Sequence, residues 1–177
     1  VYDTFARALP DGPDESKGLA MANSRARLRM TTLYALGQRA RALVAGTGNK
    51  VEDFGVGFYT KYGDGGVDLS PIADLNKTEV FALAAHLGVI EEIQQAAPTD
   101  GLWGDDRTDE DQLGATYPEL EWAMGWESQG HSEEEEAGLP WRQQEVLATY
   151  RRFHRANKHK MEPIPVCEVP DDVRFRA

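Results

Sequence analysis

The stretch ALVAGTGNKVED, residues 42–53, decides the fold that the sequence predicts. It opens with a short apolar run closed by glycine, ALVAG (42–46), which is typical of a buried strand. A second run, VDLSPIADL (67–75), predicts another strand, and Pro71 places that strand near an edge or at its own end. Because helical patterns alternate with these runs, we expect an α/β fold with a parallel sheet.

Helical patterns flank both predicted strands. Residues 20–41 predict a long helix, and residues 77–87 give the clearest helical pattern in the chain. The apolar positions of the second helix recur at i, i+3, i+4 and i+7, namely Val80, Leu83, Ala84 and Leu87. Asn76, with Glu79 three residues later, predicts a capping box at its start.

The second half of the chain predicts more helix, separated by polar segments. Thr108 and Thr116 each precede acidic residues in the way that helix starts do, and residues 140–157 predict a last helix. That helix carries Val146, Tyr150 and Phe153 on one face. Residues 96–108 form a glycine-rich loop that we expect to be mobile. The acidic segment 129–138 predicts a solvated, flexible loop.

The composition limits the class of protein. A chain of 177 residues with 41% hydrophobic and 28% charged residues suits one globular domain, residues 1–177. The net charge of −11 argues against a nucleic-acid partner, and no apolar run approaches the length of a membrane span. A single cysteine, Cys167, suits a reducing cytoplasm, and the four histidines show no spacing typical of zinc ligands.

Three side chains near the predicted strands could take part in nucleotide chemistry. Thr47 follows the first strand at the carboxyl edge of the sheet, where open α/β folds bind ligands, although an ordinary turn is the alternative. Glu52 could hold Mg²⁺ on phosphates or form a surface salt bridge. Lys77 stands in the first turn of its helix, where it could bind phosphate or remain solvated.

The first long helix carries two groups of polar side chains on different faces. Arg27 and Tyr34 are seven residues apart and share one face. Arg25 and Arg29 lie on another face as a like-charged pair, which repels unless an acceptor lies opposite. An internal or subunit partner and a phosphate or carboxylate ligand both remain open for this pair.

Longer stretches of the sequence together resemble one family. They are NSRARLRM (23–30), GTGNKVEDFGVGFYTKYGDGGVDLSPIADLNKTEVF (46–81), PTDGLWGDDRTDEDQLG (98–114) and YPELEWAM (117–124). In this order they resemble the C-terminal part of ammonia-dependent NAD⁺ synthetase, a member of the ATP-pyrophosphatase superfamily. The resemblance resumes at residues 159–160. It implies a Rossmann-like parallel sheet flanked by helices, similar to the adenine-nucleotide α-hydrolases, of which this chain is the C-terminal portion.

The glycine-rich segment YGDGG (62–66) resembles the Ser-Gly-Gly-x-Asp-Ser loop that holds pyrophosphate in this superfamily. Asp64 stands where the serine of that loop should be, and Leu69 intervenes before Ser70. The resemblance instead assigns this stretch to the dinucleotide site. Since the chain opens on Val1 and contains no match to the loop, we expect the pyrophosphate loop to lie upstream, in a part of the domain that these residues lack.

The resemblance also implies a set of site residues. The ATP contacts are Thr47, Lys77 and Thr99, and the Mg²⁺ ligand is Glu52. The contacts with deamido-NAD are Arg27, Lys61, Asp68, His159 and Lys160. Hydroxyls and lysines suit phosphates, arginine suits a carboxylate or pyrophosphate, and aspartate suits ribose hydroxyls. Phe58 and Tyr59 offer a surface on which nicotinate could stack.

The activity that the resemblance implies is the amidation of deamido-NAD by ammonia at the expense of ATP. AMP is first transferred to the nicotinate carboxylate with release of pyrophosphate, and ammonia then displaces AMP to give NAD⁺. The implied cofactor is Mg²⁺ and the implied co-substrate is ATP, in a cytoplasmic homodimer with small-molecule substrates. Two alternatives remain: a synthetase of the same superfamily with another acceptor, and a catalytically silent nucleotide-binding or interaction module.

Overall fold

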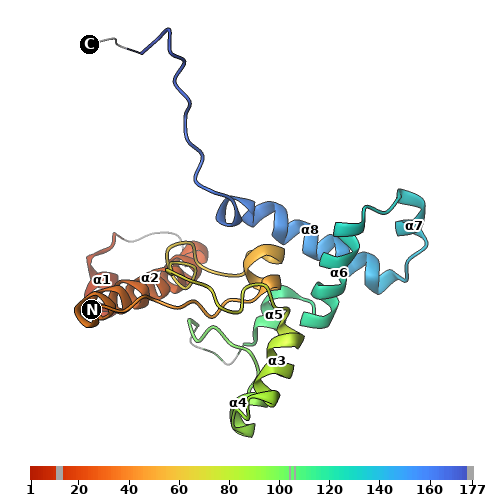
Figure 1. Cartoon of the computed structure of the whole chain (residues 1–177), viewed down its shortest axis with the longest axis horizontal. Helices are drawn as coiled ribbons and strands as arrows, with labels where there is room; N and C mark the ends of the chain where they lie inside the picture. Colours follow the sequence, from red (N-terminus) through yellow and green to blue (C-terminus); the bar gives the residue numbers. More distant parts are fainter. Residues whose placement is uncertain (11–13, 104, 106, 175–177) are drawn as a thin grey trace.

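The computed structural model describes residues 1–10, 14–103, 105 and 107–174, with the backbone alone for residues 14–17. Its helices surround a central region of loops (Figure 1). In chain order they are α1 (Tyr2–Ala8), α2 (Asp14–Ala40), the π-helix η1 (Val51–Val56), α3 (Lys77–His86), α4 (Glu91–Gln94), α5 (Asp109–Leu113), α6 (Tyr117–Gln129), α7 (Glu133–Ala137) and α8 (Trp141–Met161).

The hydrophobic core lies where α6 and α8 pack against η1. The predicted apolar face of the last helix is confirmed, because Val146 and Tyr150 are buried there and Phe153 packs against the same cluster. The buried members of the cluster are Val51, Val56, Leu113, Ala115, Tyr117, Leu120, Ala123, Val146, Leu147 and Tyr150. The core therefore joins the short helix η1 to the C-terminal third of the chain.

The helix boundaries follow local capping signals. Thr116 begins α6, where its backbone N–H donates to the Glu119 carboxylate at 2.9 Å. The predicted starts at Thr108 and Asn76 are confirmed in the same way, for α5 and α3. Helix α2 begins at Asp14, earlier than the predicted residue 20, and α8 continues to Met161.

The two predicted strands are not formed as extended elements. Residues 42–46 and 67–75 meet at a single parallel bridge between Ala45 and Leu69, beside which Gly46 N donates to Leu69 O at 2.7 Å. The prediction that the first strand is buried is wrong, since Leu43 is 70% exposed. Pairing ends after Leu69 because Pro71 has no N–H to donate and the chain turns there. A Rossmann-like sheet flanked by helices is therefore not confirmed within the described residues.

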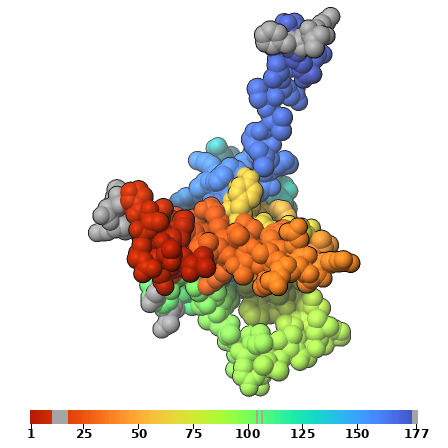
Figure 2. Space-filling view, turned by 90° about the vertical axis from the view of Figure 1, so that its left-hand side faces the viewer, coloured from red at the N-terminus to blue at the C-terminus, as the bar shows by residue number. Residues whose placement is uncertain are grey.

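Helix α3 has the predicted apolar pattern, but its apolar face is largely uncovered. No residue of α3 is buried, and Leu87 just beyond its end is 69% exposed. The helix is attached to α6 at its first turn, where Thr78 donates to the Glu121 carboxylate through N and Oγ1 at 2.9 and 2.7 Å. With α4 it projects from the body as an arm (Figures 1 and 2).

The acidic segment 129–138 contains a short helix instead of the predicted loop. Ser132 and Glu135 cap α7, and Glu136 is paired with Arg151 of α8 at 2.6 Å. Capping satisfies backbone N–H groups at the start of the helix, and the ion pair attaches the helix to α8. The predicted exposure of the segment to solvent is confirmed for most of its residues.

After α8 the chain leaves the body. Residues 162–174 extend from the end of the helix and stand clear of the other elements (Figure 2). Among the described helices none combines the length and the apolar character that crossing a membrane requires.

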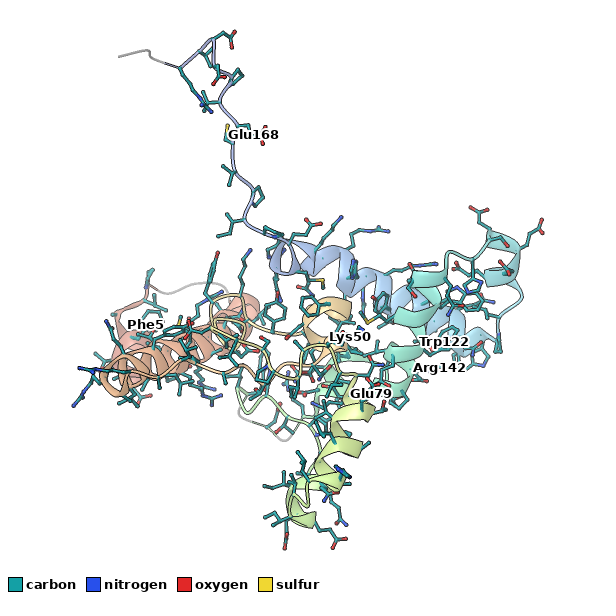
Figure 3. All side chains as sticks on the ribbon, in the orientation of Figure 1. Phe5, Lys50, Glu79, Trp122, Arg142 and Glu168 are labelled. Carbon is teal, nitrogen blue, oxygen red and sulfur yellow. The ribbon has the colours of Figure 1, made fainter. Side chains whose placement is uncertain are left out.

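The contact of α6 with α8 includes an ion pair with a measurable pH dependence. Arg142, labelled in Figure 3, donates from Nε and Nη2 to the two oxygens of Glu119, both at 2.7 Å. These hydrogen bonds lower the pKa of the Glu119 carboxyl to about 2. Because the native pKa is lowered, the stabilisation is present above the unfolded pKa and is lost as pH falls toward the native value.

We predict that Arg142→Gln lowers the free energy of unfolding near neutral pH, because the Glu119 carboxylate loses both hydrogen bonds from the guanidinium. The loss should shrink steadily as the pH is lowered through about 4 toward about 3, as measured by urea unfolding. Arg155→Gln is the matched control, since Arg155 lies on the same helix without an ion pair to the described residues. An equal loss at all pH values would show that Arg142 acts by packing instead.

Candidate functional site

The centre of the site is the loop that follows η1. Gly57 ends η1 with a left-handed backbone (φ 63°), and a Cβ there would lie 2.4 Å from Cβ of Asn157. Only glycine therefore permits η1 to approach α8 so closely. Two side chains of α8 hold the end of η1: Asn157 Nδ2 donates to Val56 O at 2.9 Å, and His154 Nδ1 lies 2.7 Å from Gly55 O.

Four of the five residues predicted to contact a dinucleotide come together beyond Gly57, with His159 contributing its backbone carbonyl oxygen. Lys160 Nζ donates to the carbonyl oxygens of Gly57 and Tyr59 at 2.9 and 2.7 Å. Lys61 Nζ donates to His159 O at 2.5 Å, and Arg27 Nε donates to Lys61 O at 3.2 Å. Burial lowers the pKa of Lys160. The arrangement joins α2, the loop and the C-terminal end of α8 into one basic cluster.

The fifth residue, Asp68, lies farther along the same loop and is already engaged. Its Oδ1 accepts a hydrogen bond from Tyr34 Oη at 3.1 Å, and its Oδ2 accepts one from Val44 N at 2.8 Å. The prediction that Arg27 and Tyr34 share a face of α2 is confirmed, because both contact the segment from Lys61 to Asp68. Asp68 therefore also fixes the segment that carries the parallel bridge.

The stretch YGDGG forms a turn that packs against α2. Asp64 Oδ1 accepts a hydrogen bond from Thr60 N at 2.9 Å, and Thr60 Oγ1 donates to Asn23 Oδ1 at 2.6 Å. A Cβ on Gly63 would lie 2.8 Å from Cβ of Ala26, so the close approach to α2 needs glycine. Asp64, which stands where the pyrophosphate loop would have its serine, thus closes the turn.

The predicted ATP side of the site contains a largely buried ion pair. Lys77 Nζ, at the start of α3, lies 3.0 Å from Oε1 of Glu52 in η1, and the side chains are 19% and 13% exposed. Thr47 and Thr99 are both exposed, and neither makes a hydrogen bond to this pair. The structure therefore brings together two of the four residues predicted for ATP and Mg²⁺.

Two buried residues that the sequence did not mark as site residues, Tyr117 and Asp109, lie beside this ion pair. Tyr117 Oη lies 2.5 Å from Oε1 of Glu52 and 3.2 Å from Oδ2 of Asp109. Burial raises the pKa of the Asp109 carboxyl, and its Oδ1 has no hydrogen-bond partner among the described residues. In the sequence Asp109 follows a helix-capping threonine, where an acidic residue is expected for helix stability alone, so no signal marked it.

A second acidic side chain, Asp53, borders the site between Glu52 and the turn. Burial, followed by the charges of Glu52 and Asp64, raises the pKa of Asp53 to about 6. Its carboxylate covers Gly48, where a Cβ would lie 2.3 Å from Asp53 Oδ1. Asp53 lines a cleft of about 160 Å³ that also includes Asp64, Tyr59 and Lys160.

The like-charged arginines of α2 face backbone acceptors. Arg29 Nη2 donates to Gly101 O at 3.2 Å, and Arg25 Nη1 donates to Leu102 O. These bonds attach the loop after Thr99 to α2, which favours the internal partner over an external ligand for this pair. A cleft of about 320 Å³ lies between the loop, α2 and α8 and is lined in part by Phe58, Tyr59, Trp103 and Phe153.

The residues at Glu52 are compatible with Mg²⁺. Within the described ranges no three His, Cys, Asp or Glu side chains stand together as metal ligands. Mg²⁺ commonly uses only one or two carboxylates, with substrate phosphates and water as its other ligands. Oε2 of Glu52 makes no hydrogen bond to the described residues, since Lys77 and Tyr117 both contact Oε1. One carboxylate oxygen is thus free for such an ion.

A basic cluster and a lysine–glutamate pair at the two ends of one loop are typical of proteins that bind phosphorylated small molecules. Comparison with known proteins is more specific. The chain belongs to the NAD synthase family, whose model matches residues 2–164. The family resemblance predicted from the sequence is therefore confirmed.

The names of similar proteins agree with this family assignment. The chain is 50% identical over 121 residues to the NH(3)-dependent NAD(+) synthetase of Carboxydothermus hydrogenoformans, covering 68% of this chain and 49% of the relative. It is 39% identical over 177 residues to the enzyme of the same name from Methanococcoides burtonii, covering 98% and 65%. The chain thus spans between about half and two thirds of the length of these relatives.

Solved structures show the same fold. The NMN synthetase from Francisella tularensis superposes with a TM-score of 0.72 at 29% identity, over 96% of this chain and 63% of that one. The NH3-dependent NAD synthetase from Campylobacter jejuni gives a TM-score of 0.68 at 23% identity, over 94% and 62%. The chain thus shares the fold of this family, although the described residues form a single isolated bridge and no extended strand.

The raised pKa of Asp53 leads to a prediction about stability. The folded chain keeps this proton to a higher pH than the unfolded chain, so stability falls as pH rises from about 4 through about 6. We predict that Asp53→Asn raises the free energy of unfolding by about 1–2 kcal/mol at about pH 8 and by little at about pH 4.

The measurement is urea unfolding across this pH range. Glu168→Gln controls for the change in net charge, because Glu168 lies on the exposed tail (Figure 3). A stabilisation by Asp53→Asn that does not depend on pH would contradict the assignment of a raised pKa.

Proposed function

We propose that this chain belongs to an enzyme of NAD⁺ biosynthesis that amidates deamido-NAD with ammonia at the expense of ATP. The observation that carries the proposal is the placement of two charged groups at the ends of one loop. Lys77, directly after the end of this loop (residues 57–76), pairs with Glu52 of η1, and Arg27, Lys61 and Lys160 gather near the start of the loop, beyond Gly57. Such an arrangement suits adenylation, because the nucleotide and the acceptor must be held close together and correctly oriented.

The basic cluster is the proposed dinucleotide end. Arg27 and Lys61 are suited to bind the pyrophosphate or the nicotinate carboxylate, and Asp68 is suited to bind ribose hydroxyls. His159 and Lys160 close this end from α8. Phe58 and Tyr59 line the 320 Å³ cleft, where the nicotinate ring can stack.

The Glu52–Lys77 pair is the proposed ATP end. Lys77 would neutralise the negative charge that builds on the departing pyrophosphate, and Thr47 and Thr99 would donate hydroxyl hydrogen bonds to phosphate oxygens. Oε2 of Glu52 would hold Mg²⁺ together with the phosphates of ATP. When bound, this ion would supply further positive charge at the leaving group.

The chemistry proceeds without a covalent bond to the protein. The nicotinate carboxylate oxygen attacks the α-phosphorus of ATP, and the bond to pyrophosphate breaks. Ammonia then attacks the carbonyl carbon of the mixed anhydride, AMP leaves with the carbon–oxygen bond electrons, and the nitrogen loses a proton to give the amide. The proposed role of the protein is to position the reactants and to stabilise charge.

Three further predictions join this proposal. The parallel direction of the Ala45–Leu69 bridge supports membership in a Rossmann-like parallel sheet. Exposed leucines on α2, Leu33 and Leu36, support a homodimer interface near this helix. The cytoplasmic location stays a prediction from composition.

The direct test is NAD⁺ formation from deamido-NAD, ATP, Mg²⁺ and ammonia, measured on this chain and on the entire product of its gene. We expect AMP and pyrophosphate in equal amounts with NAD⁺. Nicotinate mononucleotide is the second acceptor to be tried, because a structural neighbour is named an NMN synthetase. Preference for the mononucleotide would change the substrate, and no amidation of either by the gene product would favour the silent binding module.

We predict that Lys77→Met lowers kcat/KM for ATP by about 10²-fold or more, because it removes a charge that faces the leaving pyrophosphate. Lys50→Met is the matched control. Lys50 lies directly before η1, the helix that carries Glu52, but it pairs with the exposed Asp74 at 3.0 Å. Its loss should therefore change kcat/KM by less than about twofold. Equal losses in both variants would remove Lys77 from the proposed ATP end.

A further inference from the structure

Tyr117 is buried at the first position of α6, and neither the sequence motifs nor the proposed mechanism gives it a role. Its side chain is 2% exposed. A buried phenol hydroxyl needs a hydrogen-bond partner, and this one lies 2.5 Å from Glu52 Oε1. Tyr117 therefore reaches from the core directly to the proposed Mg²⁺ ligand.

The ring of Tyr117 contacts the other member of the ion pair. Lys77 Nζ lies 4.8 Å from the ring centroid while it pairs with Glu52 Oε1 at 3.0 Å. One tyrosine thus supports the lysine through its aromatic face and the carboxylate through its hydroxyl. Since η1, α3 and α6 each provide one of the three side chains, Tyr117 links the positions of all three elements.

The hydrogen bonds around Glu52 show which oxygen of its carboxylate remains available. A phenol carries one hydrogen, so it donates to one carboxylate at a time, and the shorter distance marks Glu52 as the acceptor. Lys77 and Tyr117 both contact Oε1, which leaves Oε2 without a hydrogen bond to any residue that the structure describes. Without the hydroxyl, the Glu52 carboxylate could rotate and offer both oxygens to Lys77, so that each group would neutralise the other.

Resting on the proposed function, we propose that Tyr117 is a positioning residue for the ATP end of the site. It holds Glu52 through Oε1, so that Oε2 would be available to Mg²⁺ and Lys77 to the phosphates of ATP. Asp109 Oδ2 lies 3.2 Å from the same hydroxyl.

The test uses Tyr117→Phe, which keeps the ring in the core and removes only the hydroxyl. Calorimetry measures the binding of α,β-methylene-ATP, which cannot release pyrophosphate, at a series of Mg²⁺ concentrations. We expect Tyr117→Phe to weaken Mg²⁺-dependent binding by about tenfold and to change the Kd for deamido-NAD by less than about twofold. Tyr150→Phe is the matched control, because Tyr150 is buried in the same core without a hydrogen bond to the described residues.

A double-mutant cycle shows whether Tyr117 acts through Glu52. In a Glu52→Gln background, Tyr117→Phe should cause no further loss of Mg²⁺-dependent affinity. An undiminished loss in that background, an equal loss in Tyr150→Phe, or unchanged binding by Tyr117→Phe would overturn the inference while leaving the proposed function intact. If the unmodified chain and the entire gene product bind neither the ATP analogue nor deamido-NAD, the proposed function fails, and this inference fails with it.

Discussion

The docking of η1 between α6 and α8 is the contact on which the rest of the structure depends. Val51 and Val56 at the two ends of this π-helix are fully buried, and Gly57 permits a backbone approach to Asn157 that any other residue would prevent. π-Helices are rare and are frequently found at functional sites. Here the apolar side of η1 enters the core while its acidic side, Glu52 and Asp53, remains at the candidate site.

Both ends of the site follow from this placement. Glu52 leaves η1 toward Lys77 and Tyr117, while the chain after Gly57 provides the carbonyl oxygens that hold Lys160. Helix α2 closes the other side, where Arg25 and Arg29 fix the loop after Thr99. A change in the core beneath η1 would therefore move the lysine–glutamate pair and the basic cluster together.

Part of this arrangement could be predicted from the sequence. Capping threonines and apolar periodicity predicted helices at α3, α5, α6 and α8, because these signals act over a few residues. The family and most of the basic cluster followed from a long ordered resemblance, in which Arg27, Lys61 and Lys160 stood at matching positions. The predicted strands were less successful, because a strand requires a neighbour, and residues 42–46 have one bridged partner residue, Leu69.

The buried polar contacts could not be predicted. Asp109 and Tyr117 are separated from Glu52 by more than fifty positions, and neither has a pattern that distinguishes a site residue from a capping or core residue. Their role depends on how α5 and α6 pack against η1, which is decided by the tertiary structure. Likewise, Arg25 and Arg29 look like an unfavourable pair until the carbonyl oxygens of the Thr99 loop are placed opposite them.

The most direct test of the central claim is a crystal structure of this protein with deamido-NAD, α,β-methylene-ATP and Mg²⁺. The account predicts the dinucleotide between α2, the loop after Gly57 and the end of α8, with the ATP phosphates at Lys77 and the metal ion on Glu52. It also predicts that the nicotinate carboxylate faces the α-phosphate. Binding of either ligand elsewhere, with the Glu52–Lys77 pair still closed on itself, would contradict the account.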